Sequence, residues 1–124
     1  MAKTAEFTFL RVMNGTTYFS RVTVAPGTVA GVLIGTPDTS VPAAWLDAAR
    51  AGAESASAKH IELGGTQTGL IIDQVIGTEV DTTENAVEIA AYCAAWKALG
   101  RHESQLVVAF NGEWRVSYIA SKST

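Results

Sequence analysis

The chain has 124 residues, of which 48% are hydrophobic and 17% charged, and such a length and composition are typical of one globular domain. We therefore predict a single domain over residues 1–124. The net charge of −3 and the pI near 5.3 argue against DNA binding and against any RNA binding that depends on a broad basic surface. No apolar run approaches the roughly 20 residues of a membrane span, and no secretory segment is visible, so we expect a cytoplasmic protein without membrane contact.

Three strands are predicted before the first helix. Residues 7–13 and 16–25 are rich in Phe, Val, Thr and Tyr, and Asn14 and Gly15 between them suit a type I′ turn, so the two segments should form a hairpin. Residues 29–35 are a nearly continuous apolar run, which predicts a short buried strand.

A first helix is predicted over residues 41–56, with Pro42 in its first turn, where a missing N–H is tolerated. Gly52 lowers helix propensity by about 1 kcal/mol, so its presence suggests close approach by another backbone, which we expect to belong to the sheet. Residues at spacings of three and four form the predicted inner face: Trp45, Ala48, Ala49, Gly52, Ala53 and Ala56.

A strand over residues 70–76 leads to a second predicted helix. Asp81 stands three positions before Glu84, which resembles a capping box, and Gly100 is placed to end the helix. Cys93 is the only cysteine and lies among alanines, so we interpret it as a small buried hydrophobic residue. The predicted inner face consists of Ala86, Ile89, Ala90 and Cys93.

The chain closes with a second predicted hairpin, formed by residues 105–110 and 113–119. Asn111 and Gly112 between these segments favour a two-residue turn. With that turn, one face of the hairpin is predicted to be buried: Val107, Ala109, Trp114, Val116 and Tyr118.

Sequence motifs for chemistry are weak. His60 and His102 have no His or Cys at a metal-ligand spacing, and the Gly-rich residues 64–69 lack the lysine of a phosphate-binding loop. No serine lies in a Gly-x-Ser-x-Gly motif. We therefore expect no catalytic residue, no cofactor and no metal. The basic pairs at residues 59–60 and 101–102 lie near predicted helix C-termini, where cations stabilise the helix dipole.

Both helices carry motifs at fixed spacing. The first has Val41-Pro42 followed by Trp45, Leu46, Ala48 and Gly52, and the second has Val80-Asp81-Thr82-Thr83-Glu84 followed by Ala86, Ile89 and Ala90. Together these motifs resemble the two helices of domain IV of the bacterial translocation factor EF-G and its relatives. The matching parts span about two thirds of the chain, residues 18–99.

This resemblance implies an α+β fold of the ribosomal protein S5 domain 2-like type. Its sheet would be mainly antiparallel with two helices on one face, in the order βββαβα, and here a C-terminal β-hairpin follows. It also implies a non-catalytic domain, here standing alone, that contacts a ribosomal, RNA or protein partner through its loop tips. The residues matching those tips are Asn14, Gly15, Thr16, Thr17, Tyr18, Gly77, Thr78 and Glu79.

The chain also departs from the family pattern. The family has a His in the loop before the second helix, whereas residues 77–79 supply the acidic Glu79, and no GTPase domain is present in this chain. Two other interpretations therefore stay open. One is a small-molecule-binding protein or enzyme on the same fold, which would need a pocket with convergent polar groups. The other is a structural, oligomer-forming module, which would show an apolar patch on its sheet.

Overall fold

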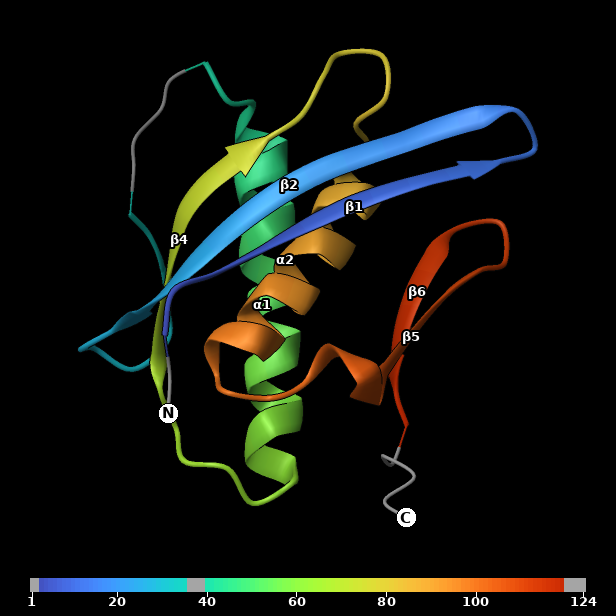
Figure 1. Ribbon diagram of the computed structural model, residues 1–124. Coiled ribbons are helices and arrows are strands. Elements are labelled where there is room, and N and C mark those ends of the chain that lie inside the picture. The colour runs from blue at the N-terminus through green and yellow to red at the C-terminus, as the bar shows by residue number, and fades with distance from the viewer. Residues whose placement is uncertain (1–2, 36–39, 120–124) are drawn as a thin grey trace.

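The architecture follows the predicted element order. A computed structural model describes residues 3–35 and 40–119 and has an α+β fold, so the predicted class and the order βββαβα with a C-terminal hairpin are confirmed (Figure 1). The elements are β1 (Ala5–Met13), β2 (Thr16–Gly27), β3 (Val32–Ile34), α1 (Ala43–Glu62), β4 (Gly69–Ile76), α2 (Glu84–Ala98), the short 3₁₀ helix η1 (Glu103–Gln105), β5 (Leu106–Phe110) and β6 (Trp114–Tyr118).

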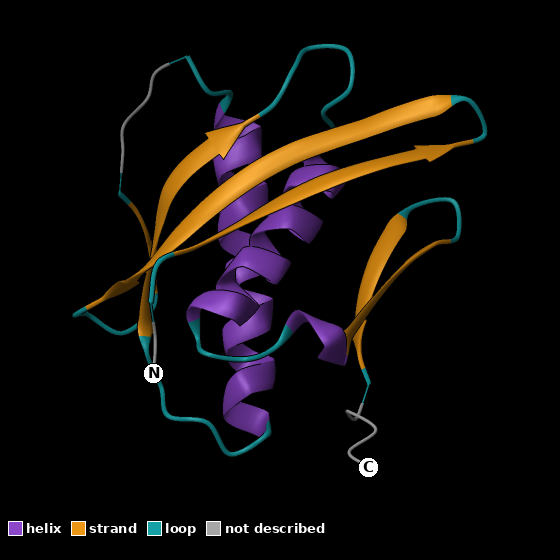
Figure 2. Ribbon diagram, viewed as in Figure 1, coloured by secondary structure: helices purple, strands orange, loops and turns teal. Residues whose placement is uncertain are grey.

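The first four strands form one mixed sheet in the order β1-β2-β4-β3. β1, β2 and β4 pair antiparallel, and β3 pairs parallel to β4, so the sheet is mainly antiparallel as predicted, with both helices on one face (Figure 2). The turn between β1 and β2 places Asn14 at φ 52° and Gly15 at φ 80°, the left-handed region that a type I′ turn requires. The turn sets a register in which Leu10 pairs with Phe19.

Helix α1 packs through its small residues against α2 rather than against the sheet. Ala49, Gly52, Ala53 and Ala56 are buried as predicted, but a Cβ built on Gly52 would lie 2.2 Å from the Glu88 carbonyl oxygen of α2. The prediction that another backbone approaches Gly52 is confirmed, but the expectation that it belongs to the sheet is wrong, because the nearest backbone is that of Glu88 in α2. The helix also runs past its predicted end to Glu62, because neither Pro nor Gly occurs between Ala56 and Gly64.

Helix α2 begins later than predicted, and its cap is Thr83. The Thr83 hydroxyl accepts a hydrogen bond from the Ala86 N–H at 3.0 Å. Asp81 is instead held in the preceding loop, where its N–H donates to the Thr78 hydroxyl at 3.0 Å. The helix is also buried far beyond the predicted face, because α1, the sheet and the C-terminal hairpin cover different sides of it. Its buried residues are Ala86, Val87, Ile89, Ala90, Ala91, Tyr92, Cys93, Ala94, Ala95, Trp96 and Ala98.

The predicted face of the C-terminal hairpin is wrong for β5. Phe110 pairs with Trp114, so the loop has three residues, with Gly112 at φ 79°, instead of the expected two. A change of one residue in loop length reverses the faces of one strand relative to the other. Val107 and Ala109 therefore point outward, and the inward face consists of Leu106, Val108, Phe110, Trp114, Val116 and Tyr118.

Replacing Gly52 by Ala tests the contact between the helices. Helix propensity alone would stabilise the variant by about 1 kcal/mol, whereas overpacking costs roughly 1 to 3 kcal/mol. Because the added methyl group would clash with the Glu88 backbone carbonyl, the cost should lie near the upper end of that range. We expect net destabilisation in urea unfolding. Ala51→Ser on the exposed side of the same turn should change stability by less than about 1 kcal/mol. A Gly52→Ala protein as stable as the parent would contradict the close approach.

Candidate functional site

The two predicted tip segments lie at the same end of the molecule. The turn at Asn14 and Gly15 closes the long β1–β2 hairpin, and the loop that begins at Gly77 joins β4 to α2 (Figure 1). We call residues 12–18 and 77–83, which contain these two segments, the tip. Residues 14–18 and 77–79 are far apart in the sequence, and the sheet brings them to one end as the resemblance implies.

Thr82 anchors the loop of the tip to β2. Its hydroxyl donates to the Phe19 carbonyl at 2.7 Å and accepts from the Thr78 N–H at 2.7 Å. The Phe19 N–H in turn donates to the Asp81 carbonyl at 2.9 Å. A Cβ on Gly77 would come within 2.5 Å of the Thr82 hydroxyl, so glycine is required for this closed loop.

The loop is attached to the β1–β2 hairpin at Phe19, some distance from the turn at Asn14 and Gly15. Thr16 is three residues before Phe19, which corresponds to about 10 Å of strand. The turn at Asn14 and Gly15 therefore projects past the loop that holds Gly77, Thr78 and Glu79 (Figure 1). The two segments share one end of the sheet, but their outermost residues are not in contact.

Tyr18 is not a free aromatic surface for a partner. Its ring packs edge-on against Trp114, with the ring centroids 5.5 Å apart, and lies 6.0 Å from the Phe110 centroid. The side chain is half-buried because β2 turns this face toward the C-terminal hairpin. The resemblance could not indicate this contact, because the hairpin lies outside the matching residues.

The exposed side chains at the tip include apolar residues that the sequence prediction missed. Val80 is 91% exposed and Val12 67% exposed. Leu10, at 54% exposure, lies on the same outward face of β1 as Val12, opposite the buried Phe9. The alternation of residues along β1 would have predicted the exposure of Leu10 and Val12, but only with the knowledge that Phe9 points inward. The tip thus combines apolar side chains with the carboxylate of the exposed Glu79.

At the opposite end of the molecule, one residue of each basic pair contacts the other: Arg101 packs against His60. The Arg101 Nε donates to His60 Nδ1 at 2.7 Å, and its guanidinium lies over the Trp96 ring, 5.3 Å from the centroid. Burial lowers the pKa of His60, and the neighbouring Arg101 charge lowers it further, partly offset by a hydrogen bond with the Thr66 backbone. Gly65 covers the imidazole so closely that a Cβ there would lie 2.4 Å from it.

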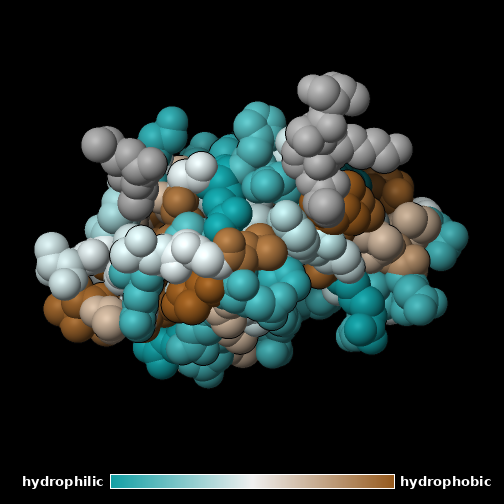
Figure 3. Space-filling view, turned by 90° about the horizontal axis from the view of Figure 1, so that it is seen from below, coloured by the Kyte–Doolittle hydropathy of each residue, from teal (hydrophilic) through white to brown (hydrophobic). Residues whose placement is uncertain are grey.

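These contacts fix the ends of the two helices and favour the structural interpretation of the basic pairs. Figure 3 views the molecule from below Figure 1, and hydrophilic residues surround separate apolar areas on this face.

The His60 contact should make stability depend on pH. The folded pKa is lowered, so the neutral imidazole stabilises the fold above the unfolded value of about 6.5. That stability should be lost as the pH falls through the folded pKa, because protonation places a charge beside Arg101. We expect chemical unfolding between pH 7.5 and about pH 5 to show this loss, and His60→Gln to abolish it. His102→Gln, at an exposed position, should retain the loss, and equal behaviour of the two variants would contradict the assignment.

The structure offers little for metal or thiol chemistry. Within residues 3–35 and 40–119, no three His, Cys, Asp or Glu side chains come together as metal ligands. Cys93 is 2% exposed, which confirms the predicted burial, and that burial raises the pKa of its thiol to about 12. No described helix is long and apolar enough to span a bilayer.

Cys93 should therefore be unreactive in the folded protein. At pH 8 the thiolate is the reacting species, so alkylation by iodoacetamide should be at least about a hundredfold slower than in urea-unfolded chain. Mass spectrometry of quenched samples measures both rates. Rapid alkylation in buffer alone would show that α2 is not buried as described.

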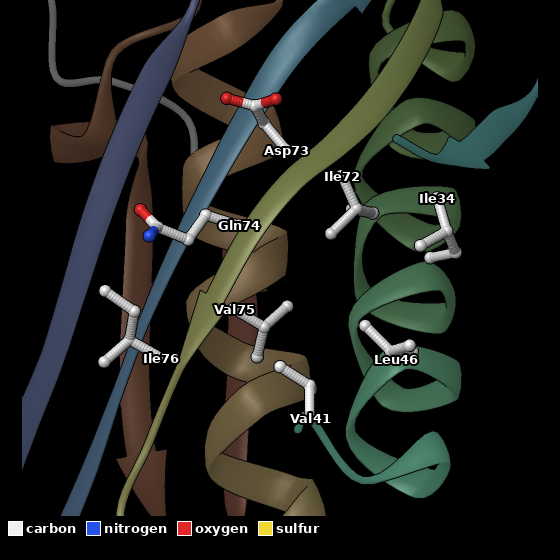
Figure 4. A pocket seen from close by; sticks show the side chains of 8 residues that line it. All are labelled: Ile34, Val41, Leu46, Ile72, Asp73, Gln74, Val75 and Ile76. Carbon is white, nitrogen blue, oxygen red and sulfur yellow. The ribbon is translucent and has the colours of Figure 1, made fainter. Parts of the chain in front are cut away.

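A cleft of about 320 Å³ lies between β4, the end of β3 and the start of α1. Ile72 and Val75 point from β4 toward Ile34, Val41 and Leu46, whereas Gln74 and Ile76 lie on the other side of the strand and Asp73 points away from the apolar side chains (Figure 4). An enzyme site would need polar groups that converge on a substrate. In this cleft the two polar side chains, Asp73 and Gln74, do not converge on a common point (Figure 4). The apolar lining consists of Ile34, Val41, Leu46, Ile72, Val75 and Ile76.

Comparison with known proteins gives a likeness of fold. No model of a known protein family matches the chain, and no curated protein matches it. Among solved structures, the chain is similar to a crystal structure of a protein from Thermus thermophilus, with a TM-score of 0.60 and 22% sequence identity. The match covers 77% of this chain and 15% of that chain, so the neighbour is several times longer and contains this fold as one part.

Proposed function

We propose that this chain is a non-catalytic binding domain of the kind that EF-G carries as domain IV, with an S5 domain 2-like fold, and that it contacts a ribosomal partner through the tip. The observation that supports this most is the arrangement of the tip, where a projecting β-hairpin and a loop anchored by Thr82 lie at one end of a rigid sheet. Loops held by a rigid scaffold commonly carry binding function.

Two further observations agree with the proposal. The motifs of both helices resemble those of EF-G domain IV, and two of their residues make close contacts: Gly52 with α2 and Thr82 with β2. The Thermus thermophilus structure contains a similar fold as 15% of a longer chain, as a domain within a larger protein would. That likeness concerns the fold, and the ribosomal partner is our inference from the motifs.

The chemistry of the tip favours a protein surface as the contact. RNA binding depends on Lys and Arg that neutralise phosphates, yet residues 12–18 and 77–83 contain neither Lys nor Arg. The exposed Val12 and Val80 suit the apolar core of a protein interface, and Glu79 suits a basic surface. We therefore expect the tip to contact a ribosomal protein with a basic rim.

Ribosome co-sedimentation with tip variants tests this function. A combined Val12→Ser and Val80→Ser change should weaken binding about fivefold or more, because each buried Val contributes on the order of 1 kcal/mol. Val29→Ser is the matched control, since Val29 is 61% exposed but lies in the β2–β3 connection at the other end. Glu79→Lys should also weaken binding.

Other outcomes separate the alternatives. Tighter binding and steeper salt dependence for Glu79→Lys would assign the tip to RNA. If the tip variants and the Val29→Ser control change ribosome binding equally, the tip is not part of the interface. Sedimentation of the chain alone detects self-association through the exposed outer face of the sheet, which includes Leu10 and Leu33. The absence of co-sedimentation with ribosomes in low salt would contradict the proposed function.

A further inference from the structure

Among residues 3–35 and 40–119, no strand pairs with β6 on the side away from β5. The Ile119 N–H donates to the Gln105 carbonyl at 2.7 Å, and hydrogen-bonded pairs alternate along an antiparallel ladder. Given the observed register, Trp114, Val116 and Tyr118 therefore direct their backbone N–H and C=O groups away from β5. Unpaired strand edges of this kind are templates for a further strand.

A side chain already occupies the first position along this edge. Asn85 of α2 accepts from the Trp114 N–H at 2.6 Å and donates to the Trp114 carbonyl at 2.9 Å. Its amide thus makes both bonds that a neighbouring strand would make. Within the described part of the chain, no group takes the same role for Val116 or Tyr118.

A hollow of about 330 Å³ runs beside this edge, between β6 and the two helices. We call it the β6 groove. One wall is formed by Glu113 and the following part of β6 as far as Ser117, and the other is formed by Ser55 of α1 with Glu88 and Tyr92 of α2. The groove therefore offers main-chain hydrogen bonds on one side and side-chain contacts on the other, which is the arrangement used in strand addition.

The charges along the groove indicate what kind of segment fits. Three charged side chains line it, namely Glu88, Glu113 and Arg115. Arg115 is paired with Glu113 at 3.1 Å, so Glu88 carries the uncompensated charge. An acidic occupant would face this carboxylate without a cation to balance it, whereas a Lys or Arg would complement it.

We propose that the β6 groove binds an extended basic peptide segment of a partner protein, which adds a strand to β6 beyond Asn85. Its backbone pairs with the free groups of Val116 and Tyr118, and one Lys or Arg lies opposite Glu88. This site uses none of the tip residues, so it does not depend on the function proposed for the tip.

Two synthetic hexapeptides provide the probe, one alternating Val with Lys and one alternating Val with Glu. With the full chain labelled for NMR, the lysine peptide should shift the amide signals of Val116 and Tyr118 and slow their hydrogen exchange. The glutamate peptide should bind at least about tenfold more weakly. Unchanged signals at millimolar lysine peptide, or equal binding of both peptides, would overturn the proposal.

Proline substitutions test the edge itself. Val116→Pro removes an outward N–H without removing a bond to β5, and should weaken the lysine peptide roughly tenfold or more. Val108→Pro removes an outward N–H from the opposite edge of the same hairpin, so it is the matched control and should bind like the parent. Equal loss in both variants would overturn the site.

Reversing the charge of Glu88 tests the groove independently of the proline variants, in case either of them unfolds. Glu88→Lys should reverse the preference between the two peptides, whereas Glu84→Lys, one turn earlier on α2 and outside the groove lining, should preserve it. An unchanged preference in Glu88→Lys would contradict the role of the groove charge.

Discussion

The close approach of α1 to the backbone of α2 is the constraint on which the rest of the structure depends. Gly52 lets α1 lie directly against the Glu88 carbonyl, and the alanines of α2 leave room for the sheet and the C-terminal hairpin on its other sides. A helix that is apolar over most of its surface, as α2 is, is stable only when its apolar sides are covered. Because α2 is held in this way, the loop at its N-terminus has a fixed base, and Thr82 can join that loop to β2.

Much of the fold could be predicted from local signals. The left-handed turn at Asn14 and Gly15, the small-residue face around Gly52 and the burial of Cys93 all follow from residue type and spacing, and the structure has them. The errors concern information that is not local. The partner of Gly52 is another helix, and the loop at Gly112 is one residue longer than the expected turn, which reverses a face of β5. Neither could be decided without the packed hairpin.

The placement of the two tip segments could be predicted from the sequence, whereas the exposure of their side chains could not. The segments around Gly15 and Thr78 lie at one end of the sheet, as the resemblance to EF-G domain IV implies. The Tyr18 ring, however, packs against Trp114 and Phe110. Val80 was missed because a motif assigns it to the start of a helix, whereas the loop leaves it 91% exposed. Contacts made by the C-terminal hairpin decide whether Tyr18 is exposed, and the family motifs do not include that hairpin.

Backbone hydrogen exchange, measured with and without ribosomal subunits, tests whether the tip contacts the ribosome, because it reports the contacted surface without any mutation. If the tip contacts the ribosome, added protection is expected along the outer part of the β1–β2 hairpin and in the loop around Thr78, with unchanged exchange in the β2–β3 connection near Val29. Protection confined to the end that carries His60 and Arg101, or no added protection at subunit concentrations that saturate co-sedimentation, would contradict it.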